Sequence, residues 1–128
     1  MLKRYLILLL IIMITNVGCG AAIFVGGTAV GAGSALYLSG ALEKEFNVTS
    51  VKLWSAAQSA AKSLKLMVQS KSEKENKYIL NCEDIDNHKI RIDVVPLTGD
   101  RSKIIIRVDT FGDEAYSRKI LDTVESKL

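Results

Sequence analysis

Apolar and polar residues alternate along much of the second half of the chain, which is the pattern of strands in a sheet with one face in water. Alternation over residues 77–84, 89–95 and 103–109 predicts three strands, joined by polar turns at 86–88 and 98–100. An earlier alternation over residues 36–46 predicts a first strand, and residues 66–69 form a short strand before a charged turn at 71–76. The predicted inward residues of the two clearest strands are Ile90, Ile92, Val94, Ile104, Ile106 and Val108.

Two segments have helical spacing instead. Asn47 or Thr49 can cap a helix that runs to about Leu66, because either side chain can accept a hydrogen bond from the first turn. Gly112 and the acidic pair after it open a last helix, since negative charge is favourable at a helix N-terminus. The predicted apolar stripes are Val51, Trp54, Ala57, Ala61 and Leu64 on the first helix, and Tyr116, Ile120, Val124 and Leu128 on the second.

The predicted order of elements is therefore β-α-β-β-β-β-α. This order is typical of the α+β class, and we expect a mostly antiparallel sheet with two helices packed on one face. Residues 36–128 would form this domain, with Trp54 anchoring the first helix to the sheet. A domain of this size can bury a core, and we expect it to be monomeric.

The first 18 residues have the layout of a secretory signal peptide. Two basic residues at positions 3 and 4 are followed by an unbroken apolar run at 5–14. This run is too short to cross a bilayer as a stop-transfer helix. Residues 17–19 read Val-Gly-Cys and resemble the lipobox of bacterial lipoproteins, in which the cysteine is the site of lipid attachment.

That resemblance implies that Cys19 receives a diacylglyceryl group and becomes the N-terminus of the mature chain. Several acyl chains anchor a protein stably to a membrane, whereas a single chain binds only reversibly. Gly20 follows the cysteine, in place of the aspartate that retains lipoproteins in the inner membrane of Gram-negative bacteria. The resemblance therefore implies a lipid-anchored protein of the outer membrane that faces the periplasm.

A glycine-rich stretch without charged side chains follows the cysteine. Seven of the nine glycines lie between positions 18 and 40, and residues 5–42 carry no charge. We expect residues 19–35 to form the lipidated N-terminus and a tether. An alternative is a helix that inserts in the membrane or oligomerises, because Gly27, Gly31, Ala35 and Ser39 stand four apart. A dinucleotide-binding loop is not expected, since Leu36 replaces its third glycine.

Charge and cysteine content exclude two further classes of protein. The formal net charge is +3, and removal of the first 18 residues leaves 15 basic and 14 acidic side chains. Nucleic-acid binding driven by charge is therefore not expected. Cys82 is the one cysteine besides Cys19, so no intramolecular disulfide can form once Cys19 is modified. We expect Cys82 to be a small buried hydrophobic residue.

No arrangement of residues typical of catalysis stands out, and we expect that the protein is not an enzyme. The single histidine, His88, lies in a predicted turn, and no local serine is placed to act as a nucleophile beside it. Glu83, Asp84, Asp86 and His88 could surround a cation, but a turn rich in acids is usually only solvated. We therefore expect neither a metal nor a cofactor.

Residues 110–120, with the sequence TFGDEAYSRKI, resemble the signature of an uncharacterised family of short bacterial lipoproteins. Members of that family share a lipobox, a glycine-rich stretch and a tryptophan in the first helix. They include small Francisella lipoproteins associated with virulence. The resemblance implies the α+β fold and an envelope location, and it supplies no catalytic residue.

The apolar stripes of the two helices predict a binding function. We expect them to meet over the sheet and to line an apolar groove formed by Trp54, Ala57, Ala61, Tyr116 and Ile120. Such a groove suits an acyl chain or a hydrophobic segment of another envelope protein, and solid packing of the same side chains is the alternative. The sequence thus predicts a lipid-anchored binding or adaptor module, with a role in virulence implied by the resemblance. The alternative function is a structural envelope component that oligomerises through the small-residue face.

Overall fold

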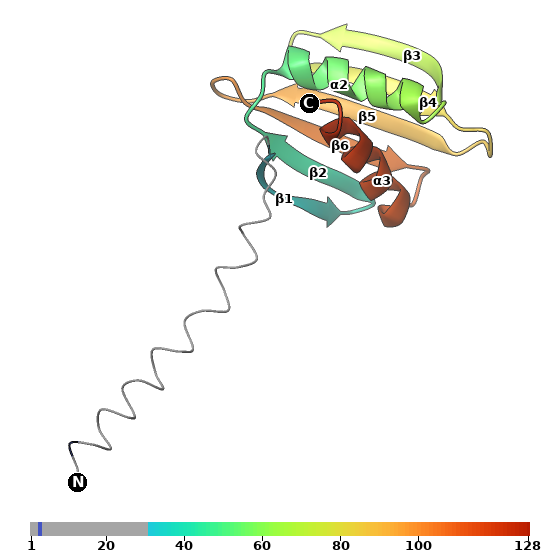
Figure 1. Cartoon of the computed structure of the whole chain (residues 1–128). Helices are drawn as coiled ribbons and strands as arrows, with labels where there is room; N and C mark the ends of the chain where they lie inside the picture. Colours follow the sequence, from blue (N-terminus) through green and yellow to red (C-terminus); the bar gives the residue numbers. More distant parts are fainter. Residues whose placement is uncertain (1–2, 4–30) are drawn as a thin grey trace.

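The computed structural model describes Lys3 and residues 31–128, which form a single antiparallel sheet covered on one face by two helices (Figure 1). The sheet order is β1-β2-β6-β5-β4-β3, and every neighbouring pair is antiparallel. This arrangement confirms the predicted α+β class and the placement of both helices. The elements are β1 Gly31–Leu38, β2 Ala41–Phe46, α2 Ser50–Ser63, β3 Met67–Lys74, β4 Lys77–Glu83, β5 Lys89–Pro96, β6 Ser102–Val108 and α3 Glu114–Glu125.

The predicted first strand at 36–46 is a hairpin of two strands, β1 and β2. Ser39 and Gly40 both have positive φ, at 51° and 80°, and this backbone geometry turns the chain between two antiparallel strands. Leu36 and Leu38 are both 58% exposed on the face away from the helices, whereas Leu42 and Phe46 of β2 are fully buried beneath the helices. The single alternation in the sequence therefore combines leucines of β1 that lie on the open face with residues of β2 that lie under the helices, where Ala35 and Tyr37 of β1 also pack.

The sheet begins at Gly31, five residues before the predicted start of the domain. Gly31 and Ala35 lie in strand β1 and Ser39 lies in the turn, so their spacing of four residues forms no helical face there. Gly27 and Cys19 lie outside the described residues. The two described helices are each too short or too polar to cross a membrane.

Strand β3 is longer than the sequence predicts. Residues 71–74, expected in a charged turn, continue the strand and pair with the start of β4. Seven of the eight β3 residues are exposed because this strand forms one edge of the sheet. Charged side chains are compatible with an edge strand, where they also discourage pairing with other chains.

Helix α2 begins as predicted, with Thr49 as N-cap accepting a hydrogen bond of 3.3 Å from the Lys52 amide. The helix ends near Leu64, because Lys65 adopts a positive φ of 57° and the Leu66 amide donates back to the Ala61 carbonyl oxygen. Its buried face is rotated from the predicted stripe. The face consists of Leu53, Trp54, Ala56, Ala57, Ala60 and Ala61, while Val51, expected to be buried, is 64% exposed.

Helix α3 packs beside α2 and over β2 and β6. Asp113 is its N-cap and accepts a hydrogen bond of 3.0 Å from the Tyr116 amide. Ile120 and Val124 are fully buried as predicted, and Lys44 forms an ion pair with Glu125 that joins the helix to β2. The core between helices and sheet also contains the six predicted inward residues of β5 and β6 and the thiol of Cys82, all buried as expected.

Candidate functional site

Three connections meet at one end of the sheet, and we call this region the loop end. They are residues 39–40 between β1 and β2, residues 84–88 between β4 and β5, and residues 109–113 between β6 and α3. The strand registers bring them together, since Ala41 pairs with Arg107 and Ile90 with Val108. The described chain enters the sheet at the opposite end, where Gly31 pairs with Phe46 and Phe46 pairs with Ser102.

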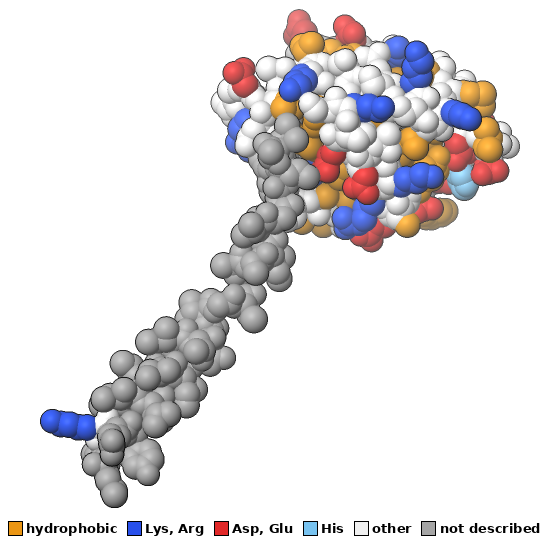
Figure 2. Space-filling view, in the orientation of Figure 1, with side chains coloured by type: hydrophobic (Ala, Val, Ile, Leu, Met, Phe, Trp, Pro, Cys, Tyr) orange, Lys and Arg blue, Asp and Glu red, His pale blue; other side chains and the backbone are white. Residues whose placement is uncertain are grey.

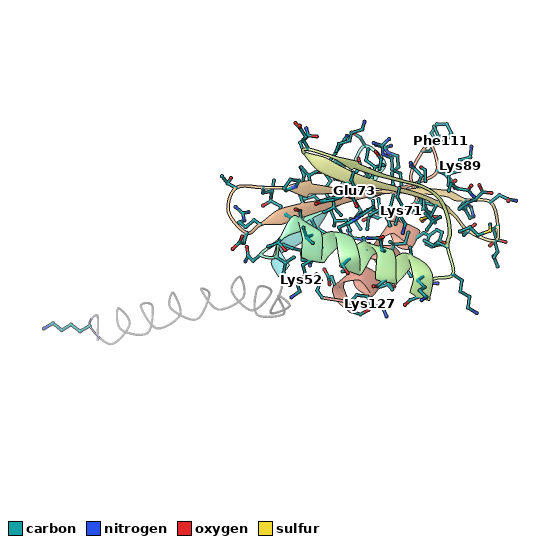
Figure 3. All side chains as sticks on the ribbon, turned by 90° about the horizontal axis from the view of Figure 1, so that it is seen from above. Lys52, Lys71, Glu73, Lys89, Phe111 and Lys127 are labelled. Atoms are coloured by element: carbon teal, nitrogen blue, oxygen red, sulfur yellow. The ribbon has the colours of Figure 1, made fainter. Side chains whose placement is uncertain are left out.

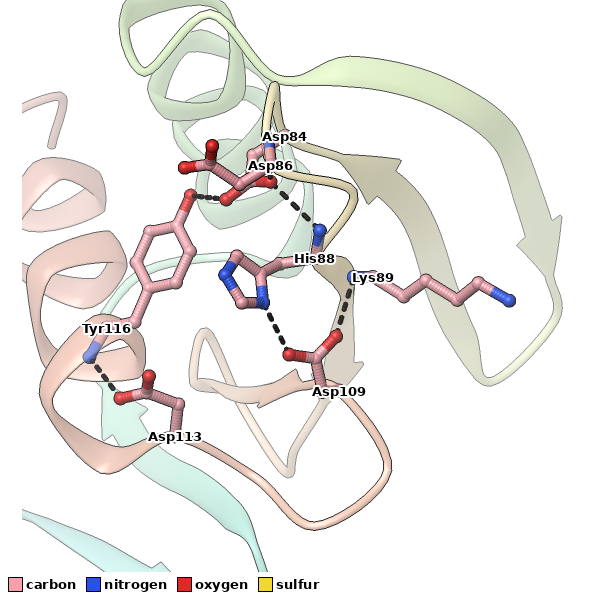
Figure 4. Close-up of polar contacts among 7 residues, drawn as sticks. All are labelled: Asp84, Asp86, His88, Lys89, Asp109, Asp113 and Tyr116. Carbon is pink, nitrogen blue, oxygen red and sulfur yellow. Dashed lines mark hydrogen bonds and ion pairs between the residues drawn. The ribbon is translucent and has the colours of Figure 1, made fainter.

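Asp84 organises the turn between β4 and β5 (Figure 4). One carboxylate oxygen, Oδ1, accepts hydrogen bonds of 2.9 Å from the amides of Asp86 and His88, and Oδ2 accepts one of 2.9 Å from the Tyr116 hydroxyl. Burial alone raises the pKa of a carboxyl group, but these hydrogen bonds outweigh it and hold the pKa of Asp84 below its ordinary value of 3.8. The ionised Asp84 therefore ties the turn to helix α3.

Asp109 joins the same turn to the end of β6. Its Oδ2 lies 2.6 Å from Nδ1 of His88, and its Oδ1 accepts a hydrogen bond of 2.9 Å from the Lys89 amide. The hydrogen bond with Asp109 raises the pKa of His88 above 6.5, and it likewise lowers the pKa of Asp109 below 3.8. Both side chains are more than 40% exposed, and Figure 2 shows a histidine among acidic side chains at the surface.

Tyr116 completes the arrangement as a hydrogen-bond donor. Burial, followed by the hydrogen bond to Asp84, raises the pKa of Tyr116 to about 12. The phenol therefore stays protonated near neutral pH and donates its hydrogen bond to Asp84. Its ring stands edge-on to the His88 ring, with 6.2 Å between centroids and 82° between planes.

A hollow of about 590 Å³ lies beside this network. It is lined by residues of three elements, among them Leu64, Lys65, Ile85, His88, Tyr116 and Lys119. Ile85 at its rim is 84% exposed, and Phe111 in the neighbouring loop is 94% exposed. Residues 31–128 contain no group of three or more potential metal ligands. The loop end thus combines a hydrogen-bonded polar network with large exposed apolar side chains.

The His88–Asp109 pair predicts a pH-dependent contribution to stability. Because folding raises the pKa of His88, its contribution is complete below about pH 6.5 and is lost as the pH rises through the folded pKa. Because folding lowers the pKa of Asp109, its contribution is present above about pH 4 and is lost as the pH falls through the folded value. The pair should therefore stabilise the domain most between about pH 4 and 6.5.

The titration of the single histidine by NMR tests this prediction without resonance assignment. Asp109→Asn should move the pKa of His88 back toward 6.5, because it removes the charged hydrogen-bond partner. Asp100→Asn, which removes a carboxylate from the turn between β5 and β6, is the matched control and should leave that pKa unchanged. A His88 pKa that is the same in Asp109→Asn and wild type would contradict the pairing.

The residues of the predicted apolar groove lie together, but mostly inside the core. Trp54 is 6% exposed, Ala57 and Ile120 are fully buried and Ala61 is 1% exposed, so these side chains fill the space they were expected to line. Tyr116 is partly buried and belongs to the hollow at the loop end instead. An apolar ligand could bind between the helices only if α2 and α3 separate. The binding of such a ligand stays a prediction.

The sequence alone did not connect the two halves of the loop-end network. The sequence places Asp84, Asp86 and His88 in one acidic turn, but Asp109 lies 21 residues from its partner His88 and Tyr116 lies 32 residues from Asp84. Only the register of β5 with β6 and the packing of α3 bring them into contact. The sequence offers one further signal for this contact, which is the acidic residue Asp109 at the end of the alternation that predicts β6.

The chain belongs to a family described as a protein of unknown function, DUF3568, whose family model matches residues 3–127. No curated protein matches the chain. The family match covers the N-terminal segment as well as the whole described domain, so the loop end lies within the part of the chain that defines the family. The family description names no activity.

Proposed function

We propose that this protein is a lipid-anchored lipoprotein of the bacterial cell envelope whose domain acts as a binding or adaptor module. The N-terminal apolar segment and the lipobox-like residues ending at Cys19 support an anchor, and Gly20 supports an outer-membrane location facing the periplasm. The domain that follows would then be held at the membrane through residues 20–30. Its partner is another envelope protein or an apolar ligand.

The observation that carries the binding role is the exposure of Ile85 and Phe111 at the loop end. Because these large apolar side chains are 84% and 94% exposed, they do not contribute to the stability of the folded domain. Their loops are nevertheless held by the hydrogen bonds of Asp84 and Asp109, so little ordering cost remains on binding. The loop end also lies opposite the point where the described chain enters the sheet, which leaves it accessible to a partner away from the anchor.

Photo-crosslinking in a bacterial host tests both parts of the proposal. Ile85→p-benzoylphenylalanine in the full chain should give an adduct of defined mass in the membrane fraction, because this side chain would contact the partner. Val51→p-benzoylphenylalanine is the matched control, since Val51 is an aliphatic residue that is also well exposed, at 64%, but lies on the first turn of α2. It should give no such adduct.

Cys19→Ser in the same background tests the anchor. It should abolish the incorporation of labelled palmitate and move the chain to the soluble fraction, because the thiol that carries the lipid is absent. The adduct at position 85 should then decrease, since a released chain no longer meets its membrane-associated partner at high local concentration. Membrane retention with unchanged labelling in Cys19→Ser would refute the anchor, and equal adducts at positions 85 and 51 would refute the loop end as the binding surface.

A further inference from the structure

The sheet face opposite the helices carries two arginines side by side at its centre. One row of register partners crosses all six strands on this open face, and its members in order are Leu38, Ala41, Arg107, Arg91, Asn81 and Ser70. Neighbouring strand residues point the other way, since Ile90, Ile92, Ile106 and Val108 are buried under the helices. Figure 3 shows Lys89 and Phe111 on the side of the sheet away from α2.

The acidic side chains of this face leave Arg107 without a partner. Asp93 forms a bidentate ion pair with Arg91, with distances of 2.9 and 3.1 Å, while Glu43 pairs with Lys103 at 3.6 Å and Glu45 pairs with Arg101. Glu83 is the register partner of Lys89. Within residues 31–128, Arg107 makes no ion pair, and the residue directly opposite it is another arginine.

The placement of Arg107 opposite Arg91 does not stabilise the folded domain. Like charges directly opposite each other on neighbouring strands destabilise a sheet, and Asp93 neutralises only one of the two arginines. The guanidinium of Arg107 reaches the turn between β1 and β2, since its Nη1 lies 3.1 Å from the position that a Cβ on Gly40 would occupy. The result is a positive charge on the open face that has no ion-pair partner within residues 31–128.

Two adjoining hollows lie beside these guanidinium groups. The larger, of about 420 Å³, is lined by hydrogen-bond donors that include Asn81, Asn87, Lys89, Arg91, Arg107 and Thr110. The smaller, of about 290 Å³, is lined by Arg91, Asp93, Ile105 and Arg107. Asp109 also lines the larger hollow, but its carboxylate accepts bonds from His88 and from the Lys89 amide. Arginine suits phosphate best among the basic residues, because its planar group can donate two parallel hydrogen bonds.

We propose that Arg107 and Arg91 form a binding site for a phosphate group on the open face of the sheet. Arg107 supplies the charge that the fold leaves unbalanced, and Arg91 and the neighbouring donors complete the contacts. The phosphate can belong to a lipid headgroup or to a soluble phosphate compound, and the two sources share this chemistry. The site shares no lining residue with the loop-end hollow, although Asn87, Asp109 and Thr110 belong to the connections at the loop end, and it does not depend on the proposed function.

NMR of the arginine Nε–H groups tests the site directly in the full chain, purified in a non-ionic detergent. Inorganic phosphate and dihexanoyl phosphatidylglycerol are titrated separately at constant ionic strength, with chloride as the control anion. Saturable shifts of the Arg107 and Arg91 signals are expected with at least one of the two probes and not with chloride. Shifts with both probes indicate a soluble phosphate as a sufficient ligand, and shifts with the lipid alone indicate a headgroup.

Variants decide whether the arginines are responsible. Arg107→Ala should weaken binding at least tenfold, whereas Arg101→Ala, which removes an arginine already paired with Glu45, should change it less than twofold. If Arg107→Ala does not fold, Arg107→Lys serves instead: it keeps the charge, loses the bidentate geometry and should still bind less tightly. The absence of saturable shifts with either probe, or an unchanged affinity in the Arg107 variant that folds, would overturn the proposal.

Discussion

Replacing Gly112 by alanine is expected to destabilise the domain by at least about 3 kcal/mol, because two costs coincide there. Gly112 has a φ of 83°, a region that residues with a Cβ occupy only with strain. The added Cβ would also lie 2.3 Å from the Tyr37 hydroxyl oxygen and 2.4 Å and 2.5 Å from the carbonyl oxygen and Cα of Gly40. Two of these three atoms belong to the backbone, which cannot rotate away.

Gly99→Ala is the matched control for this prediction. Gly99 has a similar φ of 72°, but no atom lies within 4 Å of the position of its Cβ, so only the backbone strain of about 1–2 kcal/mol is expected. Urea unfolding followed by circular dichroism gives both changes in the free energy of unfolding. Equal losses in the two variants would mean that the loop at 109–113 moves to accommodate the methyl group and that its contact with Gly40 is not tight.

The contact between Gly112 and Gly40 gives a structural reason for part of the segment at 110–120, which resembles the family signature. Gly112 must pass against the turn of the first hairpin, and the next residue, Asp113, must cap α3. Phe111 before them is not needed by the core, since it is 94% exposed. The segment thus combines two residues required by the fold with one that the fold does not explain.

The sequence predicts correctly the strands that have one face buried under the helices and one face exposed to solvent. Strands β5 and β6 lie at the centre of the sheet, and burial of every second residue under the helices produces a clear alternation. Strand β3 lies at an edge and is exposed on both faces, so its charged residues resembled a turn. The sequence predicts one strand where the first hairpin has two, because the exposed leucines of β1 continue the alternation of β2.

The candidate site was predictable only where its residues are local in sequence. The acidic turn at 84–88 is recognisable in the sequence, and the acidic pair after Gly112 marks the start of the last helix, but the role of Asp113 as its N-cap comes from the structure. The bond from His88 to Asp109 depends on strand register, which periodicity alone does not specify between two regular strands. The arginine pair on the open face is hidden for the same reason, since Arg91 and Arg107 become neighbours only through the pairing of β5 with β6.

Trp54→Ala is expected to cost about 3–5 kcal/mol, in the range of large-to-small substitutions in a packed core. Trp54 is 6% exposed on α2, and its ring stacks on Tyr78 of β4 with 5.2 Å between centroids and 20° between planes. This contact joins the helix to the sheet, so its loss leaves a cavity between the two layers. Val51→Ala on the same helix is the control and should cost no more than about 0.5 kcal/mol, because Val51 is 64% exposed.

The same variant decides whether the predicted apolar groove opens between the helices. Trp54 is the only tryptophan, so its fluorescence in the wild-type chain reports directly on an acyl chain that enters beside it. A filled core predicts a large loss of stability in Trp54→Ala and no saturable quenching of the wild-type fluorescence by a fatty acid. A loss below about 1.5 kcal/mol together with saturable quenching would show instead that the helices separate and admit a ligand, since a site that can collapse or is already partly solvated costs less to truncate.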